Sequence, residues 1–230
     1  MMNLIVWNCR RLGNLRTGNE LGDIIRAKDP YVVFIAETLT DKARLDRVMQ
    51  VIDFDNKKKG RFPRKAEGVD LVLFLKSSIN LTVEDSSKYY IDVCIDKNTV
   101  QEWRFIGFYG QAETARRTEA WDSLRSLNHH PNTPWLCAGD FNELVIQDEK
   151  LGGTIQSSNQ MQLFRDVIDE CGFMDLRFVD PKFTWSRHFK MDVQSGKDLT
   201  EVWRIMLGSN YPGHVSTTSV VIHWIMFLYS

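Results

Sequence analysis

Two short segments of this chain are apolar at every position, and each ends at a polar side chain. Leu4–Trp7 and Tyr31–Ala36 are rich in β-branched and aromatic residues, which favours β-strands, and the lack of alternation is typical of strands buried on both faces. Between them, apolar residues recur at helical spacing. We therefore predict a strand, a helix and a second strand, with Asn8 and Glu37 at the ends of the strands.

The same order recurs later in the chain. Trp103–Tyr109 and Pro134–Ala138 are strand-like, and the segment between them carries apolar residues on one face of a helix. The second strand leads to the polar residues Asp140 and Asn142, and Tyr109 ends the first. We predict that these two similar units bring their polar strand ends to one edge of the fold.

The rest of the chain predicts further strands and one clear helix. Strand-like segments separated by turn residues stand at Val69–Lys76, Ile79–Val83, Tyr90–Ile95, Phe173–Leu176, Phe183–Ser186 and Ser219–Tyr229. Apolar residues between Met161 and Cys171 form one face of an amphipathic helix, which should be capped near Ser158 or Asn159. Mixed strands with helices between them predict the α/β (α+β) class, as a layered sandwich with helices outside. With 43% hydrophobic residues, we expect residues 1–230 to form a single domain.

Charge, cysteine content and the length of apolar stretches limit which partners and which compartment we expect. The 29 Lys and Arg residues balance 30 Asp and Glu residues, so nucleic acid would have to be bound by a local patch. The four cysteines are dispersed, which predicts buried thiols in a reducing compartment. No apolar stretch reaches the length of a membrane span or a signal-peptide core.

One basic patch exists, in the segment that contains Lys57, Lys58 and Lys59. Three more basic residues follow within a few positions, interrupted by Gly60 and Pro63. A charge run of this kind is either a solvated loop or a loop that contacts phosphates, and the sequence leaves both interpretations open.

The polar strand ends suggest chemistry, each with a plainer alternative. Glu37 follows six apolar residues, where a carboxylate is costly to desolvate unless a cation or donors meet it, and Mg²⁺ prefers such oxygen ligands. Alternatively, Glu37 emerges into solvent before a helix that begins near Thr38 or Thr40. Asp140 and Asn142 either place an acid and an amide together or form an Asx-turn without further role. All five histidines lie outside these motifs, which argues against a serine or cysteine triad.

Five motifs in order carry a resemblance to a known family: IVWNCRRLG, VVFIAET, FIGFYG, WLCAGDFNE and KFTWS. With them the chain resembles the endonuclease/exonuclease/phosphatase superfamily from Met2 to about Arg187. More narrowly, it is similar to the apurinic-type endonuclease domain of plant non-LTR (LINE-type) retrotransposons, a relative of DNase I. The resemblance implies a DNase I-like four-layer architecture, in which a two-layer β-sandwich is flanked by helices.

The resemblance also implies a function and roles for single residues. The activity would be Mg²⁺-dependent (or Mn²⁺-dependent) phosphodiester hydrolysis that nicks DNA. Glu37 would be the principal metal ligand, and Asn8, the second residue of the metal site, would orient the metal-bound water or the scissile phosphate. The other implied catalytic residues are Tyr109, Asp140 and Asn142. The residues implied in nucleic-acid binding are Arg116 or Arg117, Thr184 and Trp185, to which the basic patch adds Lys57, Lys58 and Lys59.

The C-terminal part departs from the family. The resemblance leads us to expect a closing Ser-Asp-His whose Asp and His complete the acid-base machinery, but no Asp or Glu occurs after Glu201. Val220 stands where the acid is expected, between Ser219 and His223. We therefore expect residues from about 190 to 230 to be truncated or divergent, as a frameshift or a truncated gene model would produce.

Three functions follow as hypotheses. The first is a DNA endonuclease domain of retrotransposon origin whose activity is impaired by the loss of the closing Asp-His. The second is a catalytically inactive remnant that at most binds nucleic acid, and the third is a phosphatase of the same superfamily. We expect DNA as the partner, a monomer without an obligate protein partner or membrane contact, and an intracellular location, nuclear if the chain is functional.

Overall fold

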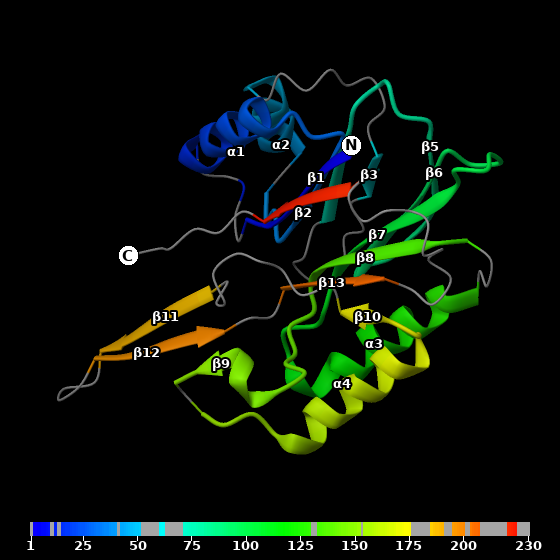
Figure 1. Cartoon of the computed structure of the whole chain (residues 1–230). Coiled ribbons are helices and arrows are strands. Elements are labelled where there is room, and N and C mark those ends of the chain that lie inside the picture. Colours follow the sequence, from blue (N-terminus) through cyan, green and yellow to red (C-terminus); the bar gives the residue numbers. More distant parts are fainter. Residues whose placement is uncertain are drawn as a thin grey trace. The chain divides into compact units, whose positions relative to one another are not determined.

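The chain divides into two compact units in its computed structural model (Figure 1). The described residues are 2–9, 12, 15–40, 42–51, 60–62, 71–129, 133–152, 154–175, 185–190, 195–200, 203–207 and 220–224. Unit 1 comprises Met1–Gly107 and Pro212–Ile225, and unit 2 comprises Phe108–Tyr211 and Met226–Ser230. The expectation of a single domain for residues 1–230 stays a prediction.

Unit 1 contains a five-stranded mixed sheet. Its strand order is β14 (Val220–Trp224), β1 (Met2–Asn8), β2 (Val32–Ala36), β4 (Leu71–Leu75) and β3 (Gly60–Phe62). Strand β1 is parallel to β14 and β2, whereas β4 is antiparallel to β2 and β3. All five residues of β2 are fully buried, as the continuous apolar run predicts.

Two helices pack beside each other in unit 1. Helix α1 (Leu15–Lys28) connects β1 to β2 and confirms the predicted strand, helix and strand. Helix α2 (Lys42–Val51) follows β2 and lies next to α1 (Figure 1). A Cβ atom on Gly18 of α1 would lie 3.4 Å from Val48 of α2, so the two helices are in close contact.

A second sheet has six strands. Their order is β10 (Met174–Asp175), β13 (Trp203–Leu207), β8 (Trp135–Asp140), β7 (Trp103–Tyr109), β6 (Tyr90–Ile95) and β5 (Leu81–Ser86). The division between the units falls within β7. Strands β5 and β6 are antiparallel, and β13 is antiparallel to both β8 and β10.

The two sheets pack face to face within unit 1. Gly107 of β7 lies against Phe34 of β2, so that a Cβ atom on Gly107 would come within 2.2 Å of the Phe34 ring. Phe34 is fully buried. Close approach of the two sheets therefore depends on the missing side chain at position 107.

Unit 2 packs two helices through aromatic side chains. Helix α3 (Arg117–Ser126) and helix α4 (Ser158–Glu170) meet where Trp121 stacks on Phe164, and Phe164 in turn contacts Phe141 directly after β8. Short 3₁₀ helices lie at Thr114–Arg116 (η1), Leu127–His129 (η2) and Gln147–Glu149 (η3). A small sheet has the order β11 (Trp185–Lys190), β12 (Ser195–Thr200) and β9 (Lys150–Leu151).

Two local predictions need correction. The N-cap of α4 is Ser157, one residue before Ser158, and the helix itself begins at Ser158. Gly60–Phe62, within the segment predicted as a loop, pairs with β4 as strand β3. In the C-terminal segment predicted as a buried strand, Val220–Trp224 forms strand β14, which pairs with β1, and the other residues of that segment lie outside the described residues.

The cysteines are buried, as the sequence predicts. All four cysteines are buried and none forms a disulfide, and burial raises the pKa of Cys94 and of Cys171 to about 11. Among the described residues, no helix has the length and apolar character needed to cross a membrane. The chain thus has the predicted α/β class, with two sheets and flanking helices.

We predict that Gly107→Ala destabilises the protein by about 1–3 kcal/mol, because the new methyl group overpacks the contact with Phe34. The free energy of unfolding in urea measures this. Gly18→Ala is the matched control, since its Cβ atom has room and alanine favours a helix by roughly 0.5–1 kcal/mol. Equal stability of Gly107→Ala and wild type would contradict the packing of β7 against β2.

Candidate active site

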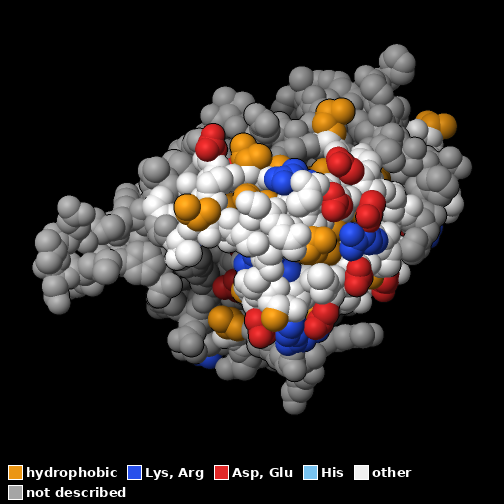
Figure 2. Space-filling model, turned by 90° about the horizontal axis from the view of Figure 1, so that it is seen from below, with side chains coloured by type: hydrophobic (Ala, Val, Ile, Leu, Met, Phe, Trp, Pro, Cys, Tyr) orange, Lys and Arg blue, Asp and Glu red, His pale blue; other side chains and the backbone are white. Residues whose placement is uncertain are grey.

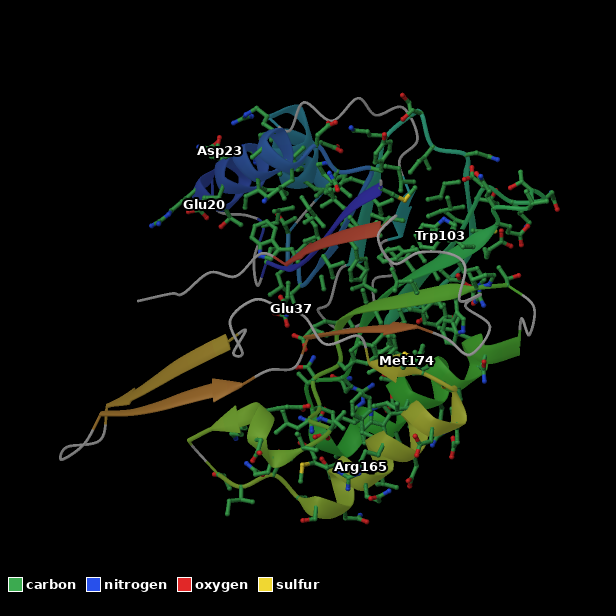
Figure 3. All side chains as sticks on the ribbon, in the orientation of Figure 1. Glu20, Asp23, Glu37, Trp103, Arg165 and Met174 are labelled. Carbon is green, nitrogen blue, oxygen red and sulfur yellow. The ribbon has the colours of Figure 1, made fainter. Side chains whose placement is uncertain are left out.

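Asn8 and Glu37 meet at the ends of neighbouring parallel strands in unit 1. The register pairs Asn8 with Ala36, which places Glu37 one residue beyond the end of β2. The Asn8 Nδ2 group donates a hydrogen bond to Glu37 Oε1 at 2.8 Å. The carboxylate lies apart from Glu20 and Asp23 on α1 (Figure 3). The parallel strand pair therefore brings together the amide and the acid that the sequence predicts as site residues.

The loop that carries Glu37 is held by the chain just after β1. The Cys9 amide donates to the Ala36 carbonyl at 3.1 Å, and the Cys9 thiol lies 3.5 Å from the carbonyl oxygens of Ala36 and Glu37. The Leu12 amide donates to the Thr38 carbonyl at 2.8 Å. These contacts fix the direction in which the chain leaves β2.

Backbone strain marks the same loop. Glu37 has a φ of 55° and Leu39 a φ of 41°, a left-handed conformation that costs an L-residue roughly 1–2 kcal/mol. Strain of this kind persists where the surrounding contacts determine the conformation, and it is found at functional sites. The left-handed turn at Glu37 is therefore a second, independent feature of this position.

In unit 2, Asp140 and Asn142 form a compact turn. The Asn142 amide donates to Asp140 Oδ1 at 3.0 Å, which is the Asx-turn that the sequence left open. Asn142 has a φ of 52°, and its Nδ2 group donates to the Gly110 carbonyl at 2.8 Å. Asp140 is 4% exposed. The acid and the amide are thus held by their own hydrogen bonds.

Gly110 allows the chain after β7 to approach this turn. Its amide donates to the Asp140 carbonyl at 2.6 Å, and a Cβ atom on Gly110 would lie 2.1 Å from the Phe141 carbonyl oxygen. A side chain at this position would therefore force the two segments apart. Tyr109, the preceding residue, is buried at the end of β7.

The two arginines predicted to contact nucleic acid both form ion pairs. Arg116 pairs with Glu119 at 3.0 Å on the surface of α3. Arg117 pairs with Glu143 at 2.6 Å, and the Glu143 side chain has no exposed surface. Glu143 was not predicted as a site residue, although an acid directly after Asn142, between Phe141 and Leu144, is a recognisable signal in the sequence. Contacts of either arginine with a phosphate stay a prediction.

Several predicted nucleic-acid-binding residues lie outside the described residues. These are Lys57, Lys58, Lys59 and Thr184, and of Trp185 only the backbone, the first residue of β11, is described. On the described part of the face shown in Figure 2, acidic and basic side chains are interspersed. That part of the surface does not show a broad area of positive charge.

The donors present fit a hard divalent cation. In unit 1, Glu37 offers a carboxylate oxygen beside the Asn8 side-chain amide. In unit 2, Asp140 offers one beside the Asn142 backbone amide. Mg²⁺ usually takes one or two protein carboxylates and completes its shell with water and phosphate oxygens. The described residues contain no group of three or more His, Cys, Asp or Glu side chains that would hold a metal by themselves. Within each unit, a carboxylate of this kind suits Mg²⁺ or Mn²⁺ better than Zn²⁺.

Comparison with solved structures shows the fold. The endonuclease domain of TRAS1, a telomere-specific non-LTR retrotransposon, is 10% identical with a TM-score of 0.62, covering 90% of this chain and 85% of that one. The AP endonuclease LMAP from Leishmania major is 15% identical with a TM-score of 0.65, covering 90% and 79%. The mannosyl-6-phosphatase Bt3783 from Bacteroides thetaiotaomicron is 12% identical with a TM-score of 0.55, covering 90% and 85%. These likenesses confirm the predicted DNase I-like fold.

The sequence itself identifies the family. No curated protein sequence matches the chain. Residues 5–191, which include both the Asn8–Glu37 pair and the Asp140–Asn142 turn, match the Endonuclease/Exonuclease/phosphatase family. The match covers well over half of the chain and confirms the resemblance carried by the five motifs. This chain is therefore a member of the endonuclease/exonuclease/phosphatase family.

Proposed function

We propose that the chain is a divalent-cation-dependent phosphodiesterase that nicks DNA, with an activity reduced by its divergent C-terminal part. The observation that carries the proposal is the Glu37 carboxylate. It stands at the end of a buried strand, in a left-handed turn, and accepts a hydrogen bond from Asn8. A carboxylate fixed in this way is prepared to hold a cation.

Glu37 is the residue to which we assign the cation, and Asn8 orients its carboxylate. A bound Mg²⁺ would neutralise the negative charge that develops on the phosphoryl oxygens during hydrolysis. Asn8 contributes by fixing Oε1 of Glu37 through the 2.8 Å hydrogen bond, so that less conformational freedom is lost when a ligand binds.

The residues of unit 2 are assigned to the phosphate and the attacking water. Asp140 positions the water and accepts its proton. An amide side chain has two N–H donors, and one of those of Asn142 binds the Gly110 carbonyl, so we assign the second to a phosphate oxygen. Tyr109 donates a hydrogen bond to another phosphate oxygen.

DNA is the proposed substrate because the chain resembles endonucleases. The motifs are similar to those of retrotransposon endonucleases, and the TRAS1 endonuclease domain shares the fold. If the substrate is DNA, the chain acts inside the cell and in the nucleus. A remnant that binds DNA without nicking it, or a phosphatase of the same family, would give different results in the assays below.

The first prediction from the proposed function concerns Glu37. Glu37→Gln keeps the size of the side chain and an acceptor for Asn8, but it removes the negative charge that holds the cation. We expect plasmid nicking in the presence of Mg²⁺ to fall at least ~100-fold, as when a group that stabilises the transition state is lost. Rates of supercoiled plasmid nicking, with and without Mg²⁺, measure this.

The matched control is Glu20→Gln, because Glu20 lies on α1, away from Glu37 (Figure 3). It should nick like wild type. Nicking by Glu37→Gln at the wild-type rate would mean that Glu37 is not the ligand. Release of inorganic phosphate from sugar phosphates, without any nicking, would assign the chain to the phosphatases instead.

The second prediction concerns the basic patch. Replacing Lys57, Lys58 and Lys59 together by glutamine should weaken DNA binding. If all three contact phosphates, the slope of the logarithm of the binding constant against the logarithm of the salt concentration should become about 2.7 less steep. Fluorescence anisotropy with duplex DNA at several salt concentrations measures this. Replacing three lysines elsewhere in unit 1, Lys28, Lys88 and Lys97, is the control. An unchanged slope in the Lys57–Lys59 variant would mean that the three lysines are solvated and do not contact phosphates.

The third prediction concerns the closing residues. Without the Asp-His pair, nicking by this chain should be at least ~10² slower than by an intact relative, since a general acid or base typically contributes 10²–10⁴. The deficit should lie in kcat rather than in DNA affinity.

The test is to graft a family-like Ser-Asp-His segment and compare single-turnover nicking rates. The graft has to keep Val220–Trp224, because this strand pairs with β1 along its length. If the native chain nicks as fast as the grafted one, its own residues supply the acid-base chemistry. The predicted loss of nicking rate from the missing Asp-His pair would then be wrong.

A further inference from the structure

Glu143, directly after Asn142, is the centre of a buried polar cluster in unit 2. Its Oε2 atom accepts a hydrogen bond from Arg117 Nη1 at 2.6 Å. Its Oε1 atom accepts from Gln156 Nε2 at 2.8 Å and from the Leu144 amide at 3.0 Å. With a side chain that is 0% exposed, Glu143 depends on these donors for the hydrogen bonds that water would otherwise give it.

Arg117 extends the cluster to the chain after β7. Its Nε group donates to the Gln111 carbonyl and its Nη2 group to the Ala112 carbonyl, both at 3.4 Å, and Nη1 also donates to Gln160 Oε1 at 3.3 Å. With the bond to Glu143, four of the five N–H donors of the guanidinium have partners within unit 2. The side chain is thus engaged with the protein rather than extended into solvent.

These contacts lie on either side of the turn assigned to the phosphate. Asn142 is bound to the Gly110 carbonyl. Arg117 holds the residues that follow Gly110, and through Glu143 it holds the residue that follows Asn142. The Asn142–Gly110 hydrogen bond connects two segments of the chain. Arg117 connects the same two segments at the next residue of each, because it binds Gln111 after Gly110 and Glu143 after Asn142.

Stability alone is a weak reason for such a pair. Replacing a buried ion pair by neutral side chains is often neutral or stabilising, whereas removing one partner leaves a buried charge and destabilises strongly. Helix α4, which carries Arg165 (Figure 3), also holds the segment by other means, since Arg165 Nη1 donates to the Val145 carbonyl at 2.5 Å. The local fold does not depend on the Arg117–Glu143 charges alone.

We propose that Arg117 and Glu143 are positioning residues, which hold Asn142 and Asp140 in the geometry needed to bind and hydrolyse a phosphodiester. Arg117 then acts through Glu143 and the chain after Gly110, rather than as a direct phosphate contact. The kinetic part of this inference rests on the proposed function, whereas its structural part does not.

The test compares Arg117→Gln, Glu143→Gln and the double variant. Each single variant leaves one buried charge and should unfold at a lower temperature, and the double variant should recover much of that loss. In the double variant we expect kcat for nicking to fall about 10–100-fold with KM little changed, because the reacting groups are misplaced. The Asn142 amide should exchange its hydrogen about 10-fold faster than in wild type.

The matched control is the double variant Arg125→Gln/Glu170→Gln. This pair likewise lies within unit 2, where it joins α3 to α4, but both side chains are partly exposed. It should leave both kcat and the Asn142 exchange rate unchanged. Arg117→Lys, which keeps the charge but loses the planar fork, should show faster Asn142 exchange even if the double variant does not fold.

Two results would overturn the proposal. Wild-type Asn142 exchange and kcat in a folded double variant would reduce the ion pair to a structural contact. A raised KM, with unchanged kcat and a salt slope reduced by about one, would make Arg117 a direct phosphate ligand. If wild type nicks no DNA, the proposed function fails, and the Asn142 exchange rate still decides whether the pair positions the turn.

Discussion

The cost of burying a charge determines where this chain can place its polar groups. All five residues of β2 are fully buried, and a carboxylate within such a strand would lose its hydration without compensation. Glu37 is the first position beyond the strand, and there its carboxylate accepts a hydrogen bond from Asn8. Parallel pairing of β1 with β2 sets the register that brings Asn8 to this point. The packing that excludes a charge from β2 therefore also explains why Glu37 lies just beyond the end of that strand.

The second unit meets the same constraint differently. Asp140 ends a strand that is buried throughout, and it satisfies its carboxylate locally by accepting the Asn142 amide. Glu143 is buried as well, but it needs a guanidinium from 26 residues earlier in the chain. A local turn and a long-range ion pair therefore hold neighbouring residues of one motif. The Asx-turn and a catalytic role for Asp140 are compatible, because the turn fixes the position of the carboxylate rather than removing it.

The parts of the fold that follow from periodicity were predictable from the sequence. Continuous apolar runs predicted β1 and β2, and helical spacing predicted α1 and α4, because burial on one or two faces leaves a direct pattern. Strand β3 was not predicted, because its three residues, Gly60–Phe62, lie in a basic segment and gain their conformation by pairing with β4. Strand β13 was also missed. Its antiparallel register with β8, which places Trp203 opposite Asp140, depends on a partner more than 60 residues away.

The candidate site was predictable where its residues follow a strand or share a motif. Glu37 and Asp140 could be predicted because a polar residue after an apolar run is conspicuous. The cluster of Glu143 with Arg117 could not, because an ion pair between distant residues leaves no periodic signal and the basic side chain could equally face a phosphate. The left-handed conformation of Glu37 was also not predictable, since glutamate has no preference for it.

The central claim is that the Glu37 carboxylate, oriented by Asn8, holds the divalent cation. Titration with substoichiometric Mn²⁺, followed by paramagnetic broadening of assigned amide resonances, tests it most directly. We predict that the amides of Asn8 and Glu37 broaden at the lowest Mn²⁺ concentrations, before those of the acidic residues on α1. Broadening centred elsewhere in the chain, with the Asn8 and Glu37 amides unaffected, would contradict the claim.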